Sequence, residues 1–118
     1  MIVPTGGPVR VMMATRPVDF RHGRDGLCAL VKEQLRGDPA SGVIYVFRAK
    51  RADRLKLVFW DGSGLVLVSK RLEQGRFRWP AIENGMMRLS PAQFSALFEG
   101  LDWRRVHAER VRTPTAVQ

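Results

Sequence analysis

The residue types that most often carry catalysis are sparse in this chain. It has one cysteine, Cys28, and two histidines, His22 and His107, which stand far apart. A structural zinc site needs about four ligands, and no carboxylates stand at a spacing that would complete one. We therefore expect no metal and no cofactor.

Two further kinds of catalytic site can be tested against the sequence. Cys28 falls beside the apolar stripe of an expected helix, where a thiol is usually buried and inert. Asp19, Asp61 and Glu83 could be offered as a trio for two metal ions, but Asp19 and Asp61 fall in turns, where local hydrogen bonding explains them. There is no Walker loop and no Rossmann glycine fingerprint. We predict that the chain has no catalytic residues and is not an enzyme.

Basic residues are the stronger chemical signal. The span from Arg48 to Arg78 holds nine basic and three acidic side chains, which is two thirds of the net charge of +9 in about a quarter of the chain. Basic groups neutralise phosphates, and arginine suits phosphates and base edges. We call the nine residues the basic ribbon: Arg48, Lys50, Arg51, Arg54, Lys56, Lys70, Arg71, Arg76 and Arg78. Arg21 and Arg24 are added to it as candidate nucleic-acid contacts.

Aromatic residues are interleaved with the basic ribbon, and aromatic rings can stack on unpaired bases. For Phe59 and Phe77 burial is the favoured interpretation, because phenylalanine is usually buried. Trp60 and Trp79 stand beside turns, and for them stacking and core packing remain equally open. The arginines themselves fit a phosphate-facing surface or a plain solvated face equally well.

Composition places the chain in a broad class. It has 118 residues, with 45% hydrophobic and 26% charged, so it should fold as one domain with its own core. A single cysteine favours a reducing compartment, and no apolar run approaches the roughly 20 residues that span a bilayer. We expect a cytoplasmic protein with no membrane partner, and its basic character fits a polyanionic one.

The helices and strands that position these residues can be predicted from the spacing of apolar residues and from turn and capping residues. Asp61-Gly62-Ser63-Gly64 separates two apolar runs and predicts a hairpin, while Ser90 with Gln93 predicts the start of a helix. Gly37 is expected to cap the first helix, and Leu101 to continue the buried stripe of the second. Strands are expected over 9–14, 43–47, 55–60, 65–72 and 86–89, an extended segment over 76–79, and helices over 24–36 and from 90 to about 101.

The order of these elements predicts an α+β fold. We expect an antiparallel sheet of about four or five strands with two helices packed on one face. The expected organisation is a flexible lead-in over 1–8, a single α+β domain over 9–105 and a disordered tail over 106–118.

Several short motifs in one order resemble a known family. They are Asp19-Phe20-Arg21-His22-Gly23, Asp25-Gly26-Leu27, Tyr45-Val46-Phe47-Arg48, Asp53-Arg54-Leu55-Lys56, Trp60-Asp61-Gly62-Ser63-Gly64, Lys70 through Phe77, Trp79-Pro80 and Gly100-Leu101-Asp102-Trp103. The chain resembles TnpB, the accessory protein encoded by the second open reading frame of insertion-sequence family sixty-six, over residues 9–105. The family often has a long apolar or aromatic residue where this chain has Arg24.

The resemblance implies a role in transposition, in support of a separate transposase that cuts and joins DNA. It supplies no catalytic residues. Two hypotheses follow. In the first, the chain binds DNA at the element ends through its basic surface. In the second, it is an interaction module that docks on the transposase complex without binding DNA by itself. The sequence does not indicate an oligomeric state.

Overall fold

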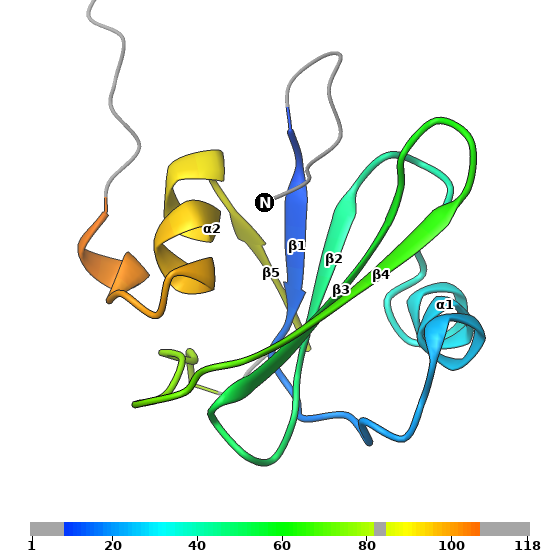
Figure 1. Ribbon diagram of the computed structural model, residues 1–118. Helices are drawn as coiled ribbons and strands as arrows, with labels where there is room; N and C mark the ends of the chain where they lie inside the picture. Colours follow the sequence, from blue (N-terminus) through cyan, green and yellow to red (C-terminus); the bar gives the residue numbers. More distant parts are fainter. Residues whose placement is uncertain (1–8, 82–84, 107–118) are drawn as a thin grey trace, which may run out of the picture.

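Five strands, two α-helices and one short 3-10 helix make up the described part of the chain. The computed structural model describes residues 9–81 and 85–106 (Figure 1). The expected lead-in, Glu83, His107 and most of the expected tail lie outside these residues. In chain order the elements are β1 (Val11–Ala14), α1 (Arg24–Glu33), β2 (Ile44–Arg48), β3 (Arg54–Trp60), β4 (Leu65–Arg71), β5 (Met86–Leu89), α2 (Pro91–Phe98) and η1 (Trp103–Arg105).

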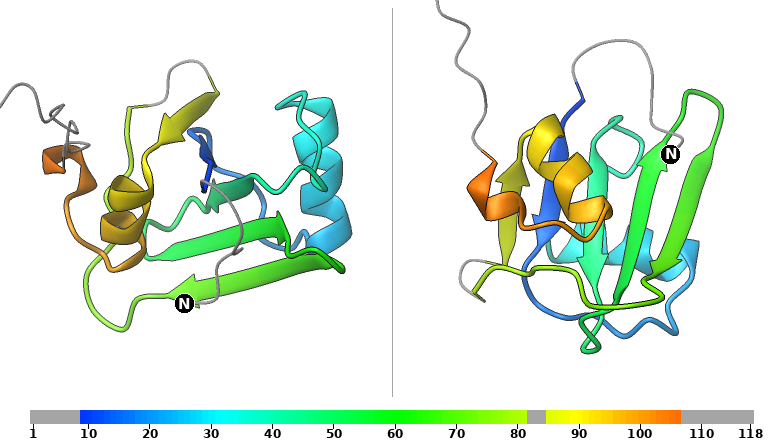
Figure 2. Two further views of the ribbon diagram at one scale, coloured as in Figure 1. Left: turned by 90° about the horizontal axis from the view of Figure 1, so that it is seen from above. Right: turned by 60° about the vertical axis from the view of Figure 1, so that its left-hand side comes forward.

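The strands form one sheet in the order β4-β3-β2-β1-β5 (Figure 2). Three of the four pairings are antiparallel, so the predicted α+β class is confirmed. The pairing of β1 with β2 is parallel, with Val11 beside Ile44. The expectation of a purely antiparallel sheet was wrong at this pair, because α1 carries the chain back between the two strands.

The two helices cover opposite faces of the sheet, which corrects the expectation that both lie on one face (Figure 1). Ile44 and Val46 pack in the core cluster that includes α2, whereas Tyr45 and Phe47 pack in the cluster that includes α1. Successive strand side chains point to opposite faces. A central strand with four buried residues in a row therefore needs a cover on each side.

Local signals in the hairpin and in α2 are confirmed. The carboxylate of Asp61 accepts hydrogen bonds from the backbone N–H groups of Ser63 (2.9 Å) and Gly64 (3.0 Å), which holds the β3–β4 turn. Ser90 and Gln93 form a reciprocal capping box at the start of α2. The helix ends at Phe98, however, so Leu101 is 60% exposed and does not belong to the buried stripe.

The first helix ends earlier than the sequence predicts. It stops at Glu33, and the residue with a left-handed backbone is Arg36 (φ 54°), not Gly37. Gly37 serves a different purpose: a Cβ atom there would collide with the hydroxyl of the buried Tyr45. Gly37 therefore allows the loop after α1 to approach Tyr45 of β2 closely, and it does not cap the helix.

Replacing Gly37 by Ala is expected to destabilise the fold by about 1–3 kcal/mol, because the added methyl overpacks a buried ring. Urea denaturation measures the free energy of unfolding. Gly64→Ala is the matched control, since a methyl group added there would meet no atom within 4 Å beyond its chain neighbours, and the φ of Gly64 is not left-handed. Removing the hydroxyl group by Tyr45→Phe should reduce the loss of stability caused by Gly37→Ala. An equal loss in the Tyr45→Phe background would contradict a collision with that hydroxyl.

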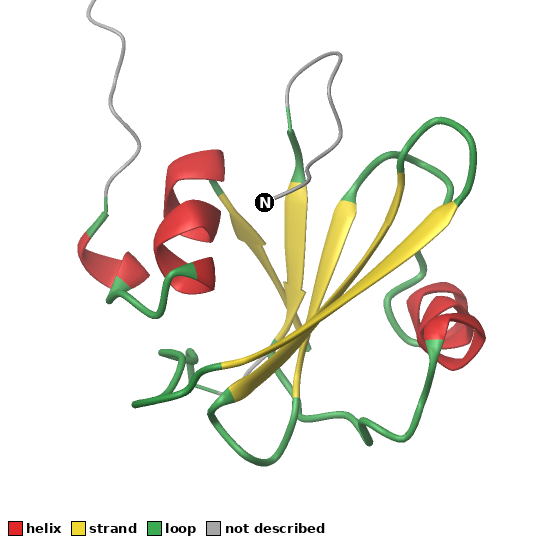
Figure 3. Ribbon diagram, viewed as in Figure 1, coloured by secondary structure: helices red, strands yellow, loops and turns green. Residues whose placement is uncertain are grey.

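The segment after β4 is loop, although the sequence predicts extended structure at 76–79 (Figure 3). The predicted alternation holds: Phe77 is buried, and Arg76 and Arg78 are exposed. The backbone N–H of Phe77 donates to the carbonyl of Ala52 (2.9 Å), which ties this loop to the β2–β3 turn. Both predictions of burial, for Phe59 and for Phe77, are confirmed.

Candidate nucleic-acid interface

Three members of the basic ribbon, Arg48, Lys56 and Lys70, donate hydrogen bonds to backbone carbonyls of other segments and so stabilise the fold. Arg48 lies at the end of β2, where its guanidinium donates to the carbonyls of Thr15 (3.4 Å) and Pro80 (3.5 Å) and lies 5.2 Å from the ring centre of Trp79. Burial lowers the pKa of Arg48. Its position explains why a charged residue stands at the end of a buried strand, and it leaves Arg48 poorly placed to contact a phosphate.

Trp79 is also occupied by the fold. Its indole N–H donates to the carbonyl of Ala52 (3.2 Å), and its ring lies 5.9 Å from that of Phe77. Core packing is therefore the structural role of Trp79, one of the two tryptophans for which stacking was left open. Trp60 is half-buried at the far end of β3, where it pairs with Leu65.

Lys56 fixes the segment between β1 and α1 onto β3. Its ammonium donates to the carbonyls of Phe20 (2.8 Å) and His22 (3.0 Å) and lies 5.0 Å from the ring centre of Phe20. The backbone N–H of Val18 donates to the carbonyl of Arg48 (2.8 Å), which anchors the same segment to β2. The segment is held over the part of the sheet where β3 begins.

Lys70 performs a similar task on the opposite face. Its ammonium donates to the carbonyl of Phe98 (2.7 Å) at the last turn of α2 and lies 4.1 Å from the ring centre of that residue. A cation at a helix C-terminus is favourable because the carbonyls there carry negative partial charge.

Replacing Lys70 by Met is expected to lower the free energy of unfolding by about 1–3 kcal/mol, through loss of a charge-assisted hydrogen bond and a cation–π contact. Met preserves most of the apolar stem. Urea denaturation is the measurement, and Arg71→Met, at the next and exposed position, should stay within about 0.5 kcal/mol of wild type. Equal stability of the two variants would remove Lys70 from the residues that support α2.

Two hollows lie beside the anchored segment and share Phe20 and Arg54 as walls. The first has a volume of about 390 Å³ and the second about 400 Å³. The other residues of the first hollow are Pro17, Val18, Asp19, Arg21, Ala49, Lys50 and Arg51. The other residues of the second are Lys56, Ser69, Lys70 and Arg71. Together they bring six basic side chains and one acidic side chain to one end of the sheet. Lys70 also borders the second hollow, but its ammonium lies on the opposite face, against Phe98.

The register of the sheet explains why these charges meet. Arg54 and Arg71 are direct partners across the β3–β4 pair, and Lys56 faces Ser69. Like charges placed opposite each other are unfavourable. Arg54 lies 3.8 Å from Asp53, while Arg71 is exposed. The pairing of β3 with β4 therefore brings the two arginines to one face of the sheet, with Asp53 beside Arg54 and solvent around Arg71.

Asp19 is the one carboxylate in the first hollow, and it is paired. The guanidinium of Arg21 donates to it at 2.6 Å, and these hydrogen bonds hold the pKa of Asp19 well below its usual range. Both groups are exposed enough for solvent to screen them. Asp19 therefore stays ionised and offsets the charge of Arg21. Lys50 and Arg51 supply most of the net charge of this hollow, because Arg54 lies beside Asp53.

The other predicted contacts lie outside the two hollows. Arg24 is exposed at the start of α1, 3.4 Å from Asp25. Arg76 and Arg78 are exposed on the loop after β4, which lies at the same end of the sheet as the β2–β3 turn (Figures 1 and 2). The structure thus gathers the side chains of Arg21, Lys50, Arg51, Arg54, Lys56 and Arg71 around the hollows. It directs Lys70 to the opposite face and leaves Arg24, Arg48, Arg76 and Arg78 apart from the hollows.

Phe20 is the residue of this region that sequence reasoning did not select. It is half-buried, and it is the aromatic wall between the two hollows. A signal existed, because Phe20 is the one aromatic residue in the turn-rich, charged segment Arg16–Gly26. The tertiary hydrogen bonds from Lys56 and from Val18 show that the segment folds back onto the sheet.

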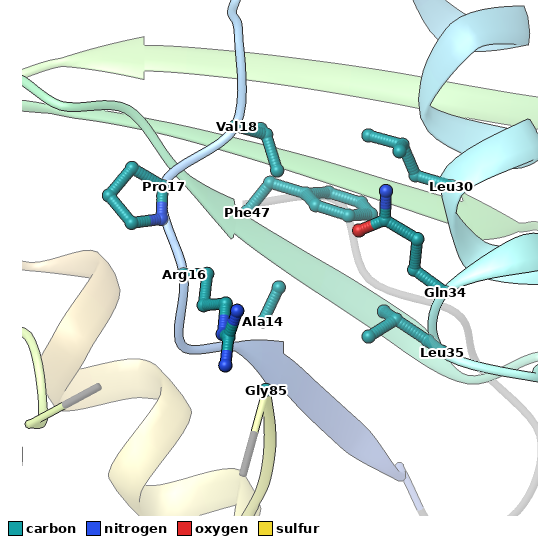
Figure 4. Close-up of a pocket in the computed structure, with 9 residues that line it drawn as sticks. All are labelled: Ala14, Arg16, Pro17, Val18, Leu30, Gln34, Leu35, Phe47 and Gly85. Carbon is teal, nitrogen blue, oxygen red and sulfur yellow. The ribbon is translucent and has the colours of Figure 1, made fainter. Parts of the chain in front are cut away.

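A third hollow lies between α1 and the end of β1, with a volume of about 250 Å³ (Figure 4). Val18, Leu30, Leu35 and Phe47 give it apolar side chains, Gln34 adds an amide, and Arg16 is its one charged lining residue. It therefore lacks the clustered positive charge of the other two hollows.

Cys28 and Asp61, which were weighed as catalytic candidates, lie in the described ranges 9–81 and 85–106. Within them, no three histidine, cysteine or carboxylate side chains lie close enough together to bind a metal ion. Cys28 is buried, and desolvation raises the pKa of its thiol. Hydrogen bonds from the turn backbone lower the pKa of Asp61, which accounts for this residue locally. Across the same ranges, no helix has the length and apolar character needed to cross a membrane.

Comparison with known proteins gives one family and two relatives. The family model described as IS66 Orf2 like protein matches residues 9–108. Uncharacterized protein y4jC of Sinorhizobium fredii is 52% identical over 117 residues, which cover 99% of each chain. Uncharacterized protein y4hO of the same organism is 42% identical over 116 residues, covering 98% of this chain and 99% of the relative. No solved structure matches the chain significantly.

Proposed function

Because the chain belongs to the IS66 Orf2-like family, a family of insertion-sequence accessory proteins, we propose that it supports DNA transposition, without catalysis of its own, by binding DNA through a basic surface. The observation that carries the proposal is the cluster of six basic side chains around the two hollows, against the single carboxylate of Asp19. The transposase would cut and join the DNA, and this protein would act beside it in the cytoplasm.

The proposed DNA-binding surface has a central group of residues, which we call its core, and a neighbouring group, which we call its margin. Exposed Lys50, Arg51 and Arg71 are the core, because they border the hollows and their side chains reach solvent. Arg76 and Arg78 form the margin on the neighbouring loop. Lys56 and Lys70 contribute charge from positions that the fold already uses, so they shape the local potential more than they bind phosphates directly.

Direct binding to labelled DNA across a salt series tests this proposal. Purified protein is titrated into element-end DNA and into unrelated DNA of equal length, from about 50 to 200 mM salt. Neutralising about four phosphates predicts that affinity falls about 150-fold over this range. Tighter binding to the element-end DNA than to the unrelated DNA would show that the protein also recognises DNA sequence.

Absence of binding at low salt would contradict a DNA-binding role for the isolated protein. The same titration repeated with the transposase present then distinguishes the second hypothesis. Binding that appears only with the transposase would favour a docking module, whose basic face meets an acidic partner or helps hold an assembled complex on DNA.

A further inference from the structure

The aromatic ring of Phe20 divides the two basic hollows, and its position is fixed by the fold. Lys56 donates hydrogen bonds to the carbonyls of Phe20 and His22, and its ammonium lies 5.0 Å from the ring centre. Val18 is bonded to β2 two residues earlier. The ring is therefore held in a defined place between two groups of cations before any ligand arrives.

Charge is distributed on both sides of this ring. Lys50 and Arg51 border the first hollow, Arg71 borders the second, and Arg54 borders both. A polyanion with regularly spaced phosphates could place one phosphate in each hollow. The chain that joins those phosphates would then pass directly over Phe20.

We propose that this surface binds an unpaired DNA strand, with phosphates in the two hollows and a base stacked against Phe20. The proposal rests on the proposed function and specifies the form of DNA. Bases within a duplex are stacked on one another, whereas an unpaired base offers its face to an aromatic side chain. A duplex could use the cations but not the ring. The arrangement therefore favours a strand end or an opened segment over intact duplex.

The simpler explanation of Phe20 is apolar packing, since it contacts the core cluster on the α1 face. Packing requires bulk and hydrophobicity, which leucine supplies. Stacking requires a flat aromatic face, which leucine lacks and tyrosine retains. The variants Phe20→Leu and Phe20→Tyr separate the two roles.

The test compares three fluorescently labelled DNAs of one sequence: a single strand, a blunt duplex, and a duplex with a single-stranded overhang. We expect the wild-type protein to bind the single strand and the overhang more tightly than the blunt duplex, by about 5-fold to 150-fold, the range typical for stacking one base. Phe20→Leu should lose most of this preference and keep its affinity for duplex. Phe20→Tyr should retain the preference.

Trp60→Leu is the matched control, because Trp60 is also half-buried but lies at the far end of β3, outside both hollows. It should leave the preference unchanged. Thermal unfolding verifies that each variant is folded. If Phe20→Leu does not fold, the comparison of single strand with blunt duplex in the wild-type protein still decides the proposal. Equal or tighter binding to blunt duplex, or a preference that survives in Phe20→Leu, would overturn the stacking proposal alone. Failure to bind any of the three DNAs would overturn the proposed function with it.

Discussion

Simultaneous replacement of Lys50, Arg51 and Arg71 by Glu is expected to lower the affinity for DNA at least about 100-fold at low salt, through lost phosphate contacts and added repulsion. All three side chains are exposed and border the basic hollows. The slope of log affinity against log salt should also become less steep, by about 0.9 for each phosphate contact removed. Fluorescence anisotropy at several salt concentrations measures both quantities.

The matched control changes the same number and types of charge elsewhere. Arg10, Lys32 and Arg88 are exposed and border neither hollow. Arg10 precedes β1, at the opposite end of that strand from the hollows, and Lys32 lies in the last turn of α1. Their replacement by Glu should reduce affinity much less, through long-range electrostatics alone. Equal losses in the two triple variants would show that net charge, not this surface, governs binding.

Replacement of Phe94 by Ala is expected to destabilise the protein by about 3–5 kcal/mol, the cost of emptying a fully buried phenylalanine site. Phe94 is 2% exposed and packs in the core cluster that joins α2 to the sheet, with Leu97 and Trp103. Urea denaturation with an unchanged m-value would show that the loss is one of stability.

Leu101→Ala is the control for this substitution, because Leu101 is 60% exposed and lies just beyond α2. Its cost should stay within about 0.5 kcal/mol. Phe98 follows Phe94 at helical spacing but is half-buried, so Phe98→Ala should cost less than Phe94→Ala. A loss below about 1 kcal/mol for Phe94→Ala would contradict the described packing of α2.

Features held within a few residues could be predicted from the sequence. The Asp61–Gly64 turn, the capping box of Ser90 and Gln93, and the burial of Phe59 and Phe77 all appear as expected. The turn and the capping box depend on hydrogen bonds between neighbouring residues, and the burial of the two phenylalanines follows from the residue type.

The site was predicted only in outline. The concentration of basic residues between Arg48 and Arg78 was visible in the sequence, but their separate structural tasks were not. Alternation along β4 places Lys70 on the same strand face as Val66 and Val68, and a lysine on an apolar face indicates that its amine has a partner. The partner, the carbonyl of Phe98, is 28 residues away and belongs to another element.

The sequence by itself determined the α+β class, the family and the positive charge of this protein, because composition, periodicity and motifs are properties of the chain. Tertiary structure decided that β1 and β2 run parallel, that the helices take opposite faces, and that Phe20 stands between two basic hollows. These features depend on contacts between distant segments, such as the 36 residues that separate Lys56 from Phe20. No local period encodes such contacts, since they form only when burial on both faces of the sheet selects one arrangement.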